Sequence, residues 1–180
     1  MSKELSVTTY PLPNNLKGAQ CVYKGTRFDV CQLSIEGHLK EAILHPGASV
    51  ILAIRENGHV VMIRNERFAV GETLLELPAG TLEPGERPLE TAARELTEET
   101  GYVAKELKLL LKFYPSPGIC TEMLYAYLAT DLTYAAQKLD ETEKITVEEY
   151  SWKEIRQFIR EQKIKDAKSL VTLMYYLQMM

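Results

Sequence analysis

Runs of apolar residues, some alternating with polar ones and some continuous, predict a series of β-strands along the chain. Residues 27–33 alternate in the way typical of a half-buried strand, and residues 38–45 indicate another. The apolar run 48–54 predicts a buried strand, and Asn57-Gly58 then predicts a hairpin turn into a strand over 60–64. Further strands are predicted over 22–23, 74–77, 107–113 and 123–129.

Three other stretches carry helix signals. One helix should begin near Arg87-Pro88, because proline is tolerated in a first turn, and should end at Gly101. Ser151 and Glu154 have the spacing of a capping box and predict a second helix. Apolar residues at helical intervals predict a third over about 166–178. Strands interleaved with helices indicate an α/β fold, and 180 residues without repeats favour one domain.

Composition excludes several partners. The formal charge of −4 and the pI near 5.5 leave no basic surface for nucleic acid. No stretch is long enough to span a membrane, and the first twenty residues lack the apolar core of a secretory signal. Cys21, Cys31 and Cys120 are odd in number and lack metal-ligand spacing, which indicates reduced thiols. We therefore expect a soluble cytoplasmic protein.

The candidate chemistry lies in an acidic segment between Gly80 and Tyr102. Glu95, Glu98 and Glu99 fall on one side of the predicted helix, where each like-charged pair costs about 0.2–0.5 kcal/mol. A cation between them would relieve that repulsion. Carboxylate oxygens favour Mg²⁺ or Mn²⁺ over zinc, and Mg²⁺ also accepts phosphate oxygens from a substrate. The alternative is a solvated, charge-rich helix face, which the hexapeptide RELTEE alone would also fit.

The complete spacing argues against that alternative. The segment reads Gly, five residues, Glu, seven residues, Arg-Glu, hydrophobic, any, Glu-Glu, any, Gly, hydrophobic, and a chance match at a given start is on the order of 10⁻⁸. It resembles the box of Nudix hydrolases, with every fixed position filled: Gly80, Glu86, Arg94, Glu95, Leu96, Glu98, Glu99, Gly101 and Tyr102. The resemblance implies the Nudix fold, an α/β/α sandwich with a mixed β-sheet, here preceded by N-terminal β-strands.

The resemblance also implies a reaction and a set of site residues. Nudix enzymes hydrolyse a nucleoside diphosphate linked to another moiety, with divalent metals holding the diphosphate. Arg94 is assigned to the catalytic set, with a structural bridge to Glu86 as the alternative. The implied metal ligands are Glu95 and Glu99, with Glu98 directly or through water and the carbonyl of Ala79.

Residues outside the box indicate a branch of the family. Pro117, about fifteen residues after the box, and Gly118 resemble the ADP-ribose pyrophosphatase branch. Arg67, thirteen residues before the box, matches an arginine that lies near the nucleotide and diphosphate in that branch. The chain departs from the branch at Asn65-Glu66, where Gln-Phe is frequent. Because of this departure, the resemblance does not predict which residues contact the base and the sugar.

A general base is expected in the acidic loop 139–144, which precedes a strand over 145–147. Related enzymes use a glutamate from this loop. Alignment on the strand favours Glu143, with Glu141 as the runner-up or as a water-mediated metal contact. The competing interpretation is an ordinary solvated loop.

The resemblance implies a single Nudix domain over residues 1–180. Residues from about 46 to 180 would form the core, and residues from about 1 to 45 would help to build a homodimer. The expected activity is Mg²⁺-dependent hydrolysis, with Mn²⁺ possible, of ADP-ribose or a related ADP-sugar to AMP and ribose 5-phosphate. The alternatives are a GDP-mannose or UDP-sugar pyrophosphatase, a non-catalytic nucleotide-sugar sensor, and an interaction module with an incidental acidic helix.

Overall fold

The computed structural model describes residues 10, 12–139 and 143–180, and it divides the chain into two compact units. The first unit comprises the chain up to Gly47 together with Tyr114–Met123, and the second comprises Ala48–Phe113 and Leu124–Met180. This division does not decide whether the whole chain folds as one domain, so the single domain stays a prediction. Among the described residues, no helix is long and apolar enough to cross a membrane. The cytoplasmic location also stays a prediction.

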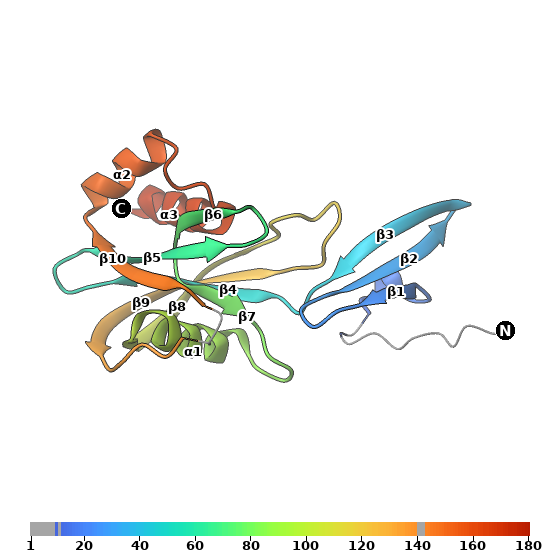
Figure 1. Ribbon diagram of the computed structural model, residues 1–180, viewed down its shortest axis with the longest axis horizontal. Coiled ribbons are helices and arrows are strands. Elements are labelled where there is room, and N and C mark those ends of the chain that lie inside the picture. The colour runs from blue at the N-terminus through green and yellow to red at the C-terminus, as the bar shows by residue number, and fades with distance from the viewer. Residues whose placement is uncertain (1–9, 11, 140–142) are drawn as a thin grey trace. The chain divides into compact units, whose positions relative to one another are not determined.

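The first unit is built on an antiparallel sheet of three strands in the order β1-β2-β3 (Figure 1). The side chains of Cys21, Cys31 and Leu44 form its small core. Segment 114–123 runs beside β3, where the amide of Ile43 donates to the carbonyl of Ile119 at 2.7 Å. The elements are the 3₁₀ turn η1 (Asn14–Leu16), β1 (Gln20–Lys24), β2 (Asp29–Ile35) and β3 (His38–Leu44). The predicted N-terminal strands are thereby confirmed.

The second unit is a seven-stranded mixed sheet with helices on both faces. Its main strand order is β10-β5-β4-β9-β8, with β6 beside β5 and β7 beside β4. Only β4 and β9 pair in parallel among the described strands. Helix α1 covers one face of the sheet, and α2 and α3 cover the other (Figure 1). The elements are β4 (Ala48–Ile54), β5 (Val60–Arg67), β6 (Glu72–Glu76), β7 (Ala79–Thr81), α1 (Pro88–Thr100), β8 (Tyr102–Phe113), β9 (Leu124–Tyr134), β10 (Ile145–Tyr150), α2 (Trp152–Arg160) and α3 (Ala167–Met179).

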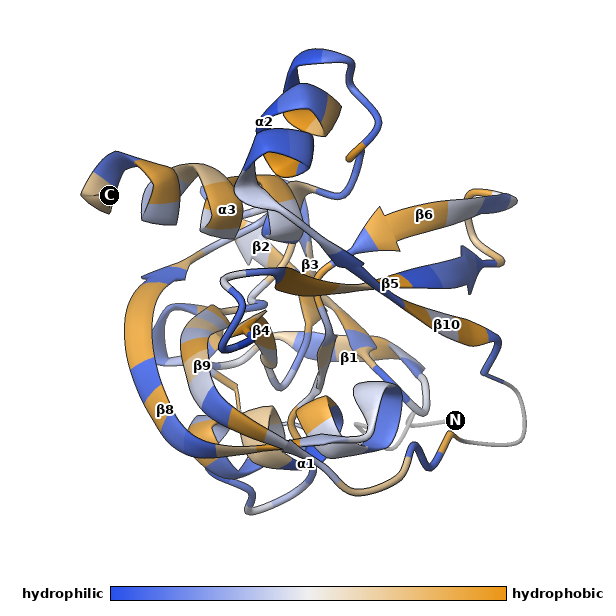
Figure 2. Cartoon of the chain, turned by 90° about the vertical axis from the view of Figure 1, so that its left-hand side faces the viewer, coloured by the Kyte–Doolittle hydropathy of each residue, from blue (hydrophilic) through white to orange (hydrophobic). Residues whose placement is uncertain are grey.

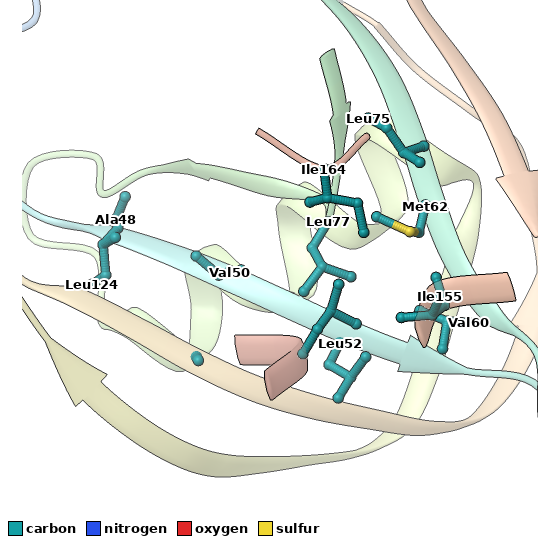
Figure 3. Close-up of a cluster of buried hydrophobic side chains, with 12 residues drawn as sticks. Ala48, Val50, Leu52, Val60, Met62, Leu75, Leu77, Leu124, Ile155 and Ile164 are labelled. Atoms are coloured by element: carbon teal, nitrogen blue, oxygen red, sulfur yellow. The ribbon is translucent and has the colours of Figure 1, made fainter. Parts of the chain in front are cut away.

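Strand β4 is buried on both faces, which explains its continuous apolar sequence. Val50 and Leu52 face α2 and α3, and belong to a cluster with Leu77 and Ile155 (Figure 3). Ile51 and Ala53 point the opposite way, toward α1, and belong to a cluster that includes Ala92 and Leu96. Full burial of each large aliphatic side chain contributes about 1.5–3 kcal/mol. The α/β/α sandwich with a mixed sheet is therefore confirmed.

Several strands differ from the predicted boundaries. β8 begins at Tyr102, five residues before the predicted start, because its first residues also pair with β9, although hydrophilic residues are interspersed with hydrophobic ones along it (Figure 2). β5 continues to Arg67, so this arginine lies on a strand. Residues 79–81, which follow the predicted strand 74–77, form the further short strand β7 by pairing with β4.

Gly101 ends α1 as predicted, in the left-handed conformation with φ of 75°. A Cβ there would lie 2.7 Å from Cε2 of Tyr134 and 2.8 Å from the backbone nitrogen of Gln137. Position 101 therefore requires glycine for two reasons, its backbone conformation and the closeness of the end of β9 and of the residues that follow it.

The two reasons can be separated by experiment. Gly101→Ala should lower the free energy of unfolding by roughly 1–3 kcal/mol more than Gly58→Ala, because both positions have positive φ but only Gly101 meets neighbouring atoms. Urea unfolding of both variants measures the difference. Equal losses would mean that the backbone conformation alone accounts for the glycine.

Candidate functional site

The acidic segment is anchored where α1 begins. Pro88 is the first residue of α1, and its carbonyl accepts a hydrogen bond from the Ser49 hydroxyl on β4 at 2.7 Å. Strand β7 pairs with the same part of β4, with Gly80 opposite Ser49. The glycine end of the segment and the start of its helix are therefore fixed to one buried strand.

Gly80 is required because a carboxylate fills the space beside it. A Cβ at Gly80 would lie 1.8 Å from Oε1 of Glu95 and 1.9 Å from its carboxyl carbon. Glycine alone among the residue types leaves room at position 80 for the side chain of Glu95, which is only 13% exposed. The spacing between the first glycine and this glutamate therefore has a direct steric meaning.

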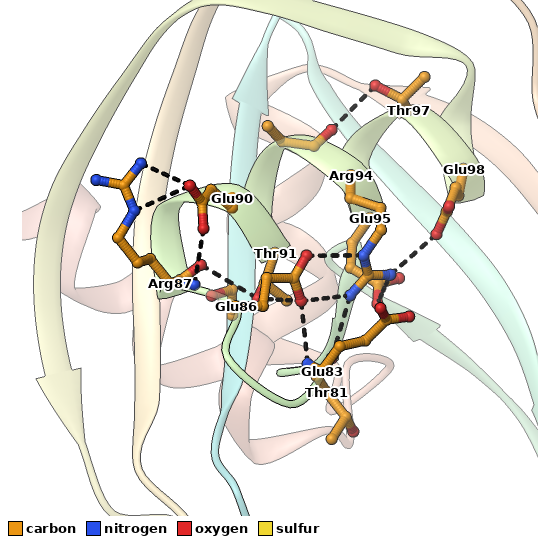
Figure 4. Close-up of polar contacts among 12 residues, drawn as sticks. Thr81, Glu83, Glu86, Arg87, Glu90, Thr91, Arg94, Glu95, Thr97 and Glu98 are labelled. Carbon is orange, nitrogen blue, oxygen red and sulfur yellow. Dashed lines mark hydrogen bonds and ion pairs between the residues drawn. The ribbon is translucent and has the colours of Figure 1, made fainter.

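Arg94 holds three carboxylates at once (Figure 4). Its Nε and Nη2 donate to the two oxygens of Glu86 at 2.9 and 3.0 Å. Its Nη1 donates to Glu95 at 2.7 Å and to Glu98 at 3.0 Å. Nη2 also donates to the carbonyl of Thr81 at 3.2 Å. Arg94 thus makes the predicted bridge to Glu86 and also orients two predicted metal ligands.

Glu86 is the most firmly held acid of this group. The hydrogen bonds from Arg94 lower its pKa to about 2, against an opposing effect of burial. The Glu83 amide donates to Glu86 at 3.0 Å and the Thr91 hydroxyl at 2.8 Å, which lower the pKa further. Glu86 therefore stays ionised and serves as an anchor for Arg94.

Glu99 has the opposite electrostatic environment. It is 3% exposed, and burial raises its pKa to about 8, with the charges of Glu95 and Glu143 adding to the effect. One hydrogen bond, from the Ala79 amide at 2.8 Å, favours its ionised form. The pKa of Glu95 is also raised, by burial first and despite Arg94. Burial and the neighbouring carboxylates thus disfavour ionisation of both Glu95 and Glu99.

Glu143 lies close enough to this cluster to raise the pKa of both Glu95 and Glu99. It stands two residues before β10, whose Ile145 pairs with Asn65 on β5. The next residue, Lys144, bonds through Nζ to Glu66 at 2.9 Å. The pairing of β10 with β5 therefore brings the predicted base to the acidic helix, while Glu141 lies outside the described residues.

The donors in this cluster fit a hard divalent cation, because they are all oxygens and include a buried carboxylate with a raised pKa. They are not a complete ligand set as they stand. Within the described residues, no three acidic, histidine or cysteine side chains converge as a metal-binding group. Glu95 and Glu98 bond to Arg94 instead, and the Ala79 contact seen is made by its amide. The ligand roles of Glu95, Glu98, Glu99 and Ala79 remain predictions.

Arg67 makes an ion pair with Glu76 that the sequence analysis did not predict. Its Nε and Nη2 donate to the two oxygens of Glu76 at 2.8 and 2.6 Å, and Lys168 Nζ contacts Glu76 at 2.5 Å. Glu76 is fully buried. The available signal was a lone carboxylate in the apolar sequence LLELP, but nothing nearby indicated its partners.

Pro117 and Gly118 belong to the first unit, in the connection between β8 and β9. They line a cavity of about 400 Å³ together with Leu16, Ala42 and Tyr114, among other residues of that unit. The acidic residues and Arg67 belong to the second unit. The substrate contacts of Pro117 and Gly118 remain predictions.

Comparisons with known proteins agree with these features. Residues 43–173 match the family model described as NUDIX domain. The chain is 38% identical over 138 residues to an ADP-ribose pyrophosphatase of Bacillus subtilis (strain 168), covering 76% of this chain and 75% of the relative. It is 36% identical to a GDP-mannose pyrophosphatase of Enterobacter sp. (strain 638), covering 72% of each.

A solved structure described as an ADP compounds hydrolase has the same fold. Its TM-score is 0.75 at 22% identity, covering 89% of this chain and 90% of the other. At that identity the likeness speaks for the fold alone.

The Glu86–Arg94 contact predicts a pH-dependent contribution to stability. The folded pKa of Glu86, about 2, lies below the ordinary value of 4.5, so its ionised form favours the folded state. Glu86→Gln should therefore lower the free energy of unfolding by about 1–3 kcal/mol above pH 5. The loss should shrink as the pH falls from 4.5 toward 2.

Urea unfolding at several pH values from 7 to 3 measures this difference. Glu106→Gln, at an exposed position on β8, is the control and should change stability little at any pH. A Glu86→Gln loss that stays constant with pH would show that the ion pair does not depress this pKa.

Proposed function

This chain belongs to the NUDIX family, and we propose that it hydrolyses the diphosphate bond of ADP-ribose, or of a closely related ADP-sugar, with Mg²⁺. The products are AMP and ribose 5-phosphate or the corresponding sugar phosphate. The family, the complete box and the pyrophosphatase relatives identify the protein as a Nudix hydrolase. The observation that carries the proposal is the buried Glu99 carboxylate, crowded by Glu95 and Glu143.

The acidic cluster is the proposed cation site. Glu95, Glu99 and Glu98 would hold the ion, together with the carbonyl of Ala79. Mg²⁺ bound there supplies neutralisation of the phosphoryl charge and a lowered pKa for a coordinated water. The raised pKa values of Glu95 and Glu99 support this assignment, because a nearby cation favours the ionised form of both groups. Mn²⁺ satisfies the same oxygen donors.

Arg94 has a positioning role in this proposal. Glu86 fixes its guanidinium through two hydrogen bonds, and the remaining donors orient Glu95 and Glu98. Such bidentate, charge-assisted contacts set the orientation of both partners. Arg94 would hold the mutually repelling carboxylates together until they bind a cation.

Glu143 is the proposed general base. Its carboxylate would accept a proton from the attacking water, and its closeness to Glu95 and Glu99 supports that role. Arg67, Pro117 and Gly118 are the proposed substrate contacts, carried over from the resemblance to the ADP-ribose branch. A homodimer formed through the N-terminal strands is proposed on the same ground.

ADP-ribose is the first choice of substrate because a relative of 38% identity is an ADP-ribose pyrophosphatase. GDP-mannose is the second candidate, because a relative at 36% identity is a GDP-mannose pyrophosphatase. The sequence Asn65-Glu66, where the ADP-ribose branch often has Gln-Phe, keeps both in consideration. A panel of ADP-ribose, ADP-glucose, GDP-mannose and UDP-glucose separates them by kcat/KM for nucleoside monophosphate release.

Glu99→Gln should reduce kcat on the preferred substrate by roughly 10² or more, because it removes a ligand charge while nearly keeping shape. Calorimetric titration with Mg²⁺ should show weakened binding in the same variant. Glu106→Gln, on the exposed side of β8, is the matched control and should keep wild-type activity.

Two results would count against these assignments. Wild-type turnover in Glu99→Gln would remove Glu99 from the metal site. No turnover of any sugar nucleotide by the wild-type protein would overturn the proposed function.

Glu143→Gln should lower kcat by roughly 10² while Mg²⁺ affinity changes little, because an amide cannot accept the proton from water. Steady-state kinetics and Mg²⁺ titration on the same preparation measure the two quantities. An unchanged rate would move the base to another residue, with Glu141→Gln as the next variant.

A further inference from the structure

A buried carboxylate lies in the otherwise apolar end of β6. Glu76 is 0% exposed, and three charge-assisted contacts reach it: two from Arg67, at 2.8 and 2.6 Å, and one from Lys168, at 2.5 Å. Burial alone would raise the pKa of Glu76, but the hydrogen bonds from Arg67 and the charge of Lys168 hold it below its usual value. Glu76 is therefore ionised and shared between two cations.

Arg67 pairs with a buried carboxylate and not with the exposed carboxylate opposite it. In the register of β5 and β6, Arg67 lies opposite Glu72, which is exposed and bonds to Lys165 at 2.5 Å. Arg67 instead reaches along the sheet to the buried Glu76. A surface pair at Glu72 would leave the guanidinium mobile, whereas the bidentate contact with a buried carboxylate fixes its plane.

A contact of this kind is weak evidence for a stabilising role. Desolvation of buried charges often exceeds their mutual attraction, and well-packed apolar residues would stabilise the fold as well or better. Orientation of a functional group is the alternative use of the same contact. The geometry points that way, because both oxygens of Glu76 engage Arg67 and fix the plane of its guanidinium.

The surrounding contacts tie this pair to the proposed cation site. Lys168 also contacts Asp166 at 2.9 Å, and Asp166 caps α3 through the amide of Ser169. The hydroxyl of Ser169 accepts a hydrogen bond at 2.7 Å from the amide of Leu77, the residue after Glu76. Two residues after Leu77, the amide of Ala79 at the start of β7 donates to Glu99. One segment thus carries both the anchor of Arg67 and a contact to the acidic helix.

Arg67 is also electrostatically coupled to that helix, because its charge favours ionisation of Glu99. Its contacts with Glu76 use Nε and Nη2, which leaves Nη1 outside the pair. The guanidinium is therefore held from one side, with its charge near the acidic cluster.

We propose that Glu76, supported by Lys168, is a positioning residue that holds the guanidinium of Arg67 in the orientation in which it contacts the diphosphate of the substrate. This inference rests on the proposed function and on the substrate-binding role of Arg67. Glu76 itself does not touch the substrate. Its effect on catalysis must therefore pass through Arg67.

A double-mutant cycle tests this dependence. Glu76→Gln, Arg67→Ala and the double variant are compared by kcat and KM on the sugar nucleotide that the wild-type protein hydrolyses best. Glu76→Gln should raise KM about tenfold with kcat changed less than about twofold. In the Arg67→Ala background, Glu76→Gln should add nothing. Glu72→Gln, on the same strand with its own lysine contact, is the matched control and should keep the wild-type KM.

Multiplicative losses in the double variant would overturn the proposal, because Glu76 would then act independently of Arg67. An unchanged KM in folded Glu76→Gln, or in Arg67→Ala, would overturn it too. Thermal unfolding and circular dichroism show whether each variant is folded. Arg67→Lys provides a second route if Glu76→Gln does not fold, since it keeps the charge but loses the bidentate geometry.

Arg67→Lys should raise KM about as much as the glutamine variant, and a wild-type KM there would contradict the proposal. The activity of the wild-type protein separates failure of this proposal from failure of the proposed function. If the wild-type protein hydrolyses no sugar nucleotide, the proposed function is refuted. If it does, and the losses of the two single variants multiply in the double variant, only the role of Glu76 is refuted.

Discussion

Mutual repulsion among carboxylates is the physical constraint that the contacts of the second unit must offset. Three glutamates of one short segment share the guanidinium of Arg94, and a fourth, Glu99, is almost completely buried. Arg94 offsets part of that charge, Glu86 fixes Arg94, and Gly80 leaves room for Glu95. The buried strand β4 and the helices on both faces provide the rigid framework that this concentration of like charge requires.

Two charged groups in this unit differ in their balance of charge. Around Arg94, acids outnumber the base, and the pKa values of two glutamates rise. Around Glu76, the charges of Arg67 and Lys168 are matched by Glu76 and Asp166, and the pKa of Glu76 falls. The first arrangement favours a bound cation, and the second holds the guanidinium of Arg67 in one orientation. A diphosphate bound with a divalent ion would complement both at once, which is why we assign the two groups to a single reaction.

Local sequence signals predicted much of this structure. The start of α1 at Pro88, its end at Gly101 and the Ser151–Glu154 capping box depend on neighbours a few residues away, and the structure confirms them. Contacts over long distances were not predictable in this way. Glu76 and Lys168 are 92 residues apart in sequence, and β7 exists only because β4 lies beside it. Arg67 and Glu76 are only nine residues apart, but their contact depends on the pairing of β5 with β6, which the sequence analysis did not predict.

The path of the chain between the two units has a consequence for engineering. Segment 114–123 belongs to the first unit, although it connects two strands of the second. A truncated protein beginning at Ala48 would keep this segment but lose β3, against which its backbone makes hydrogen bonds. Deletion of the chain before Ala48 would therefore leave segment 114–123 without the strand that it pairs with. A minimal version of the second unit requires two coordinated cuts, with a short designed turn joining Phe113 to Leu124, and it would lose the proposed substrate contacts Pro117 and Gly118.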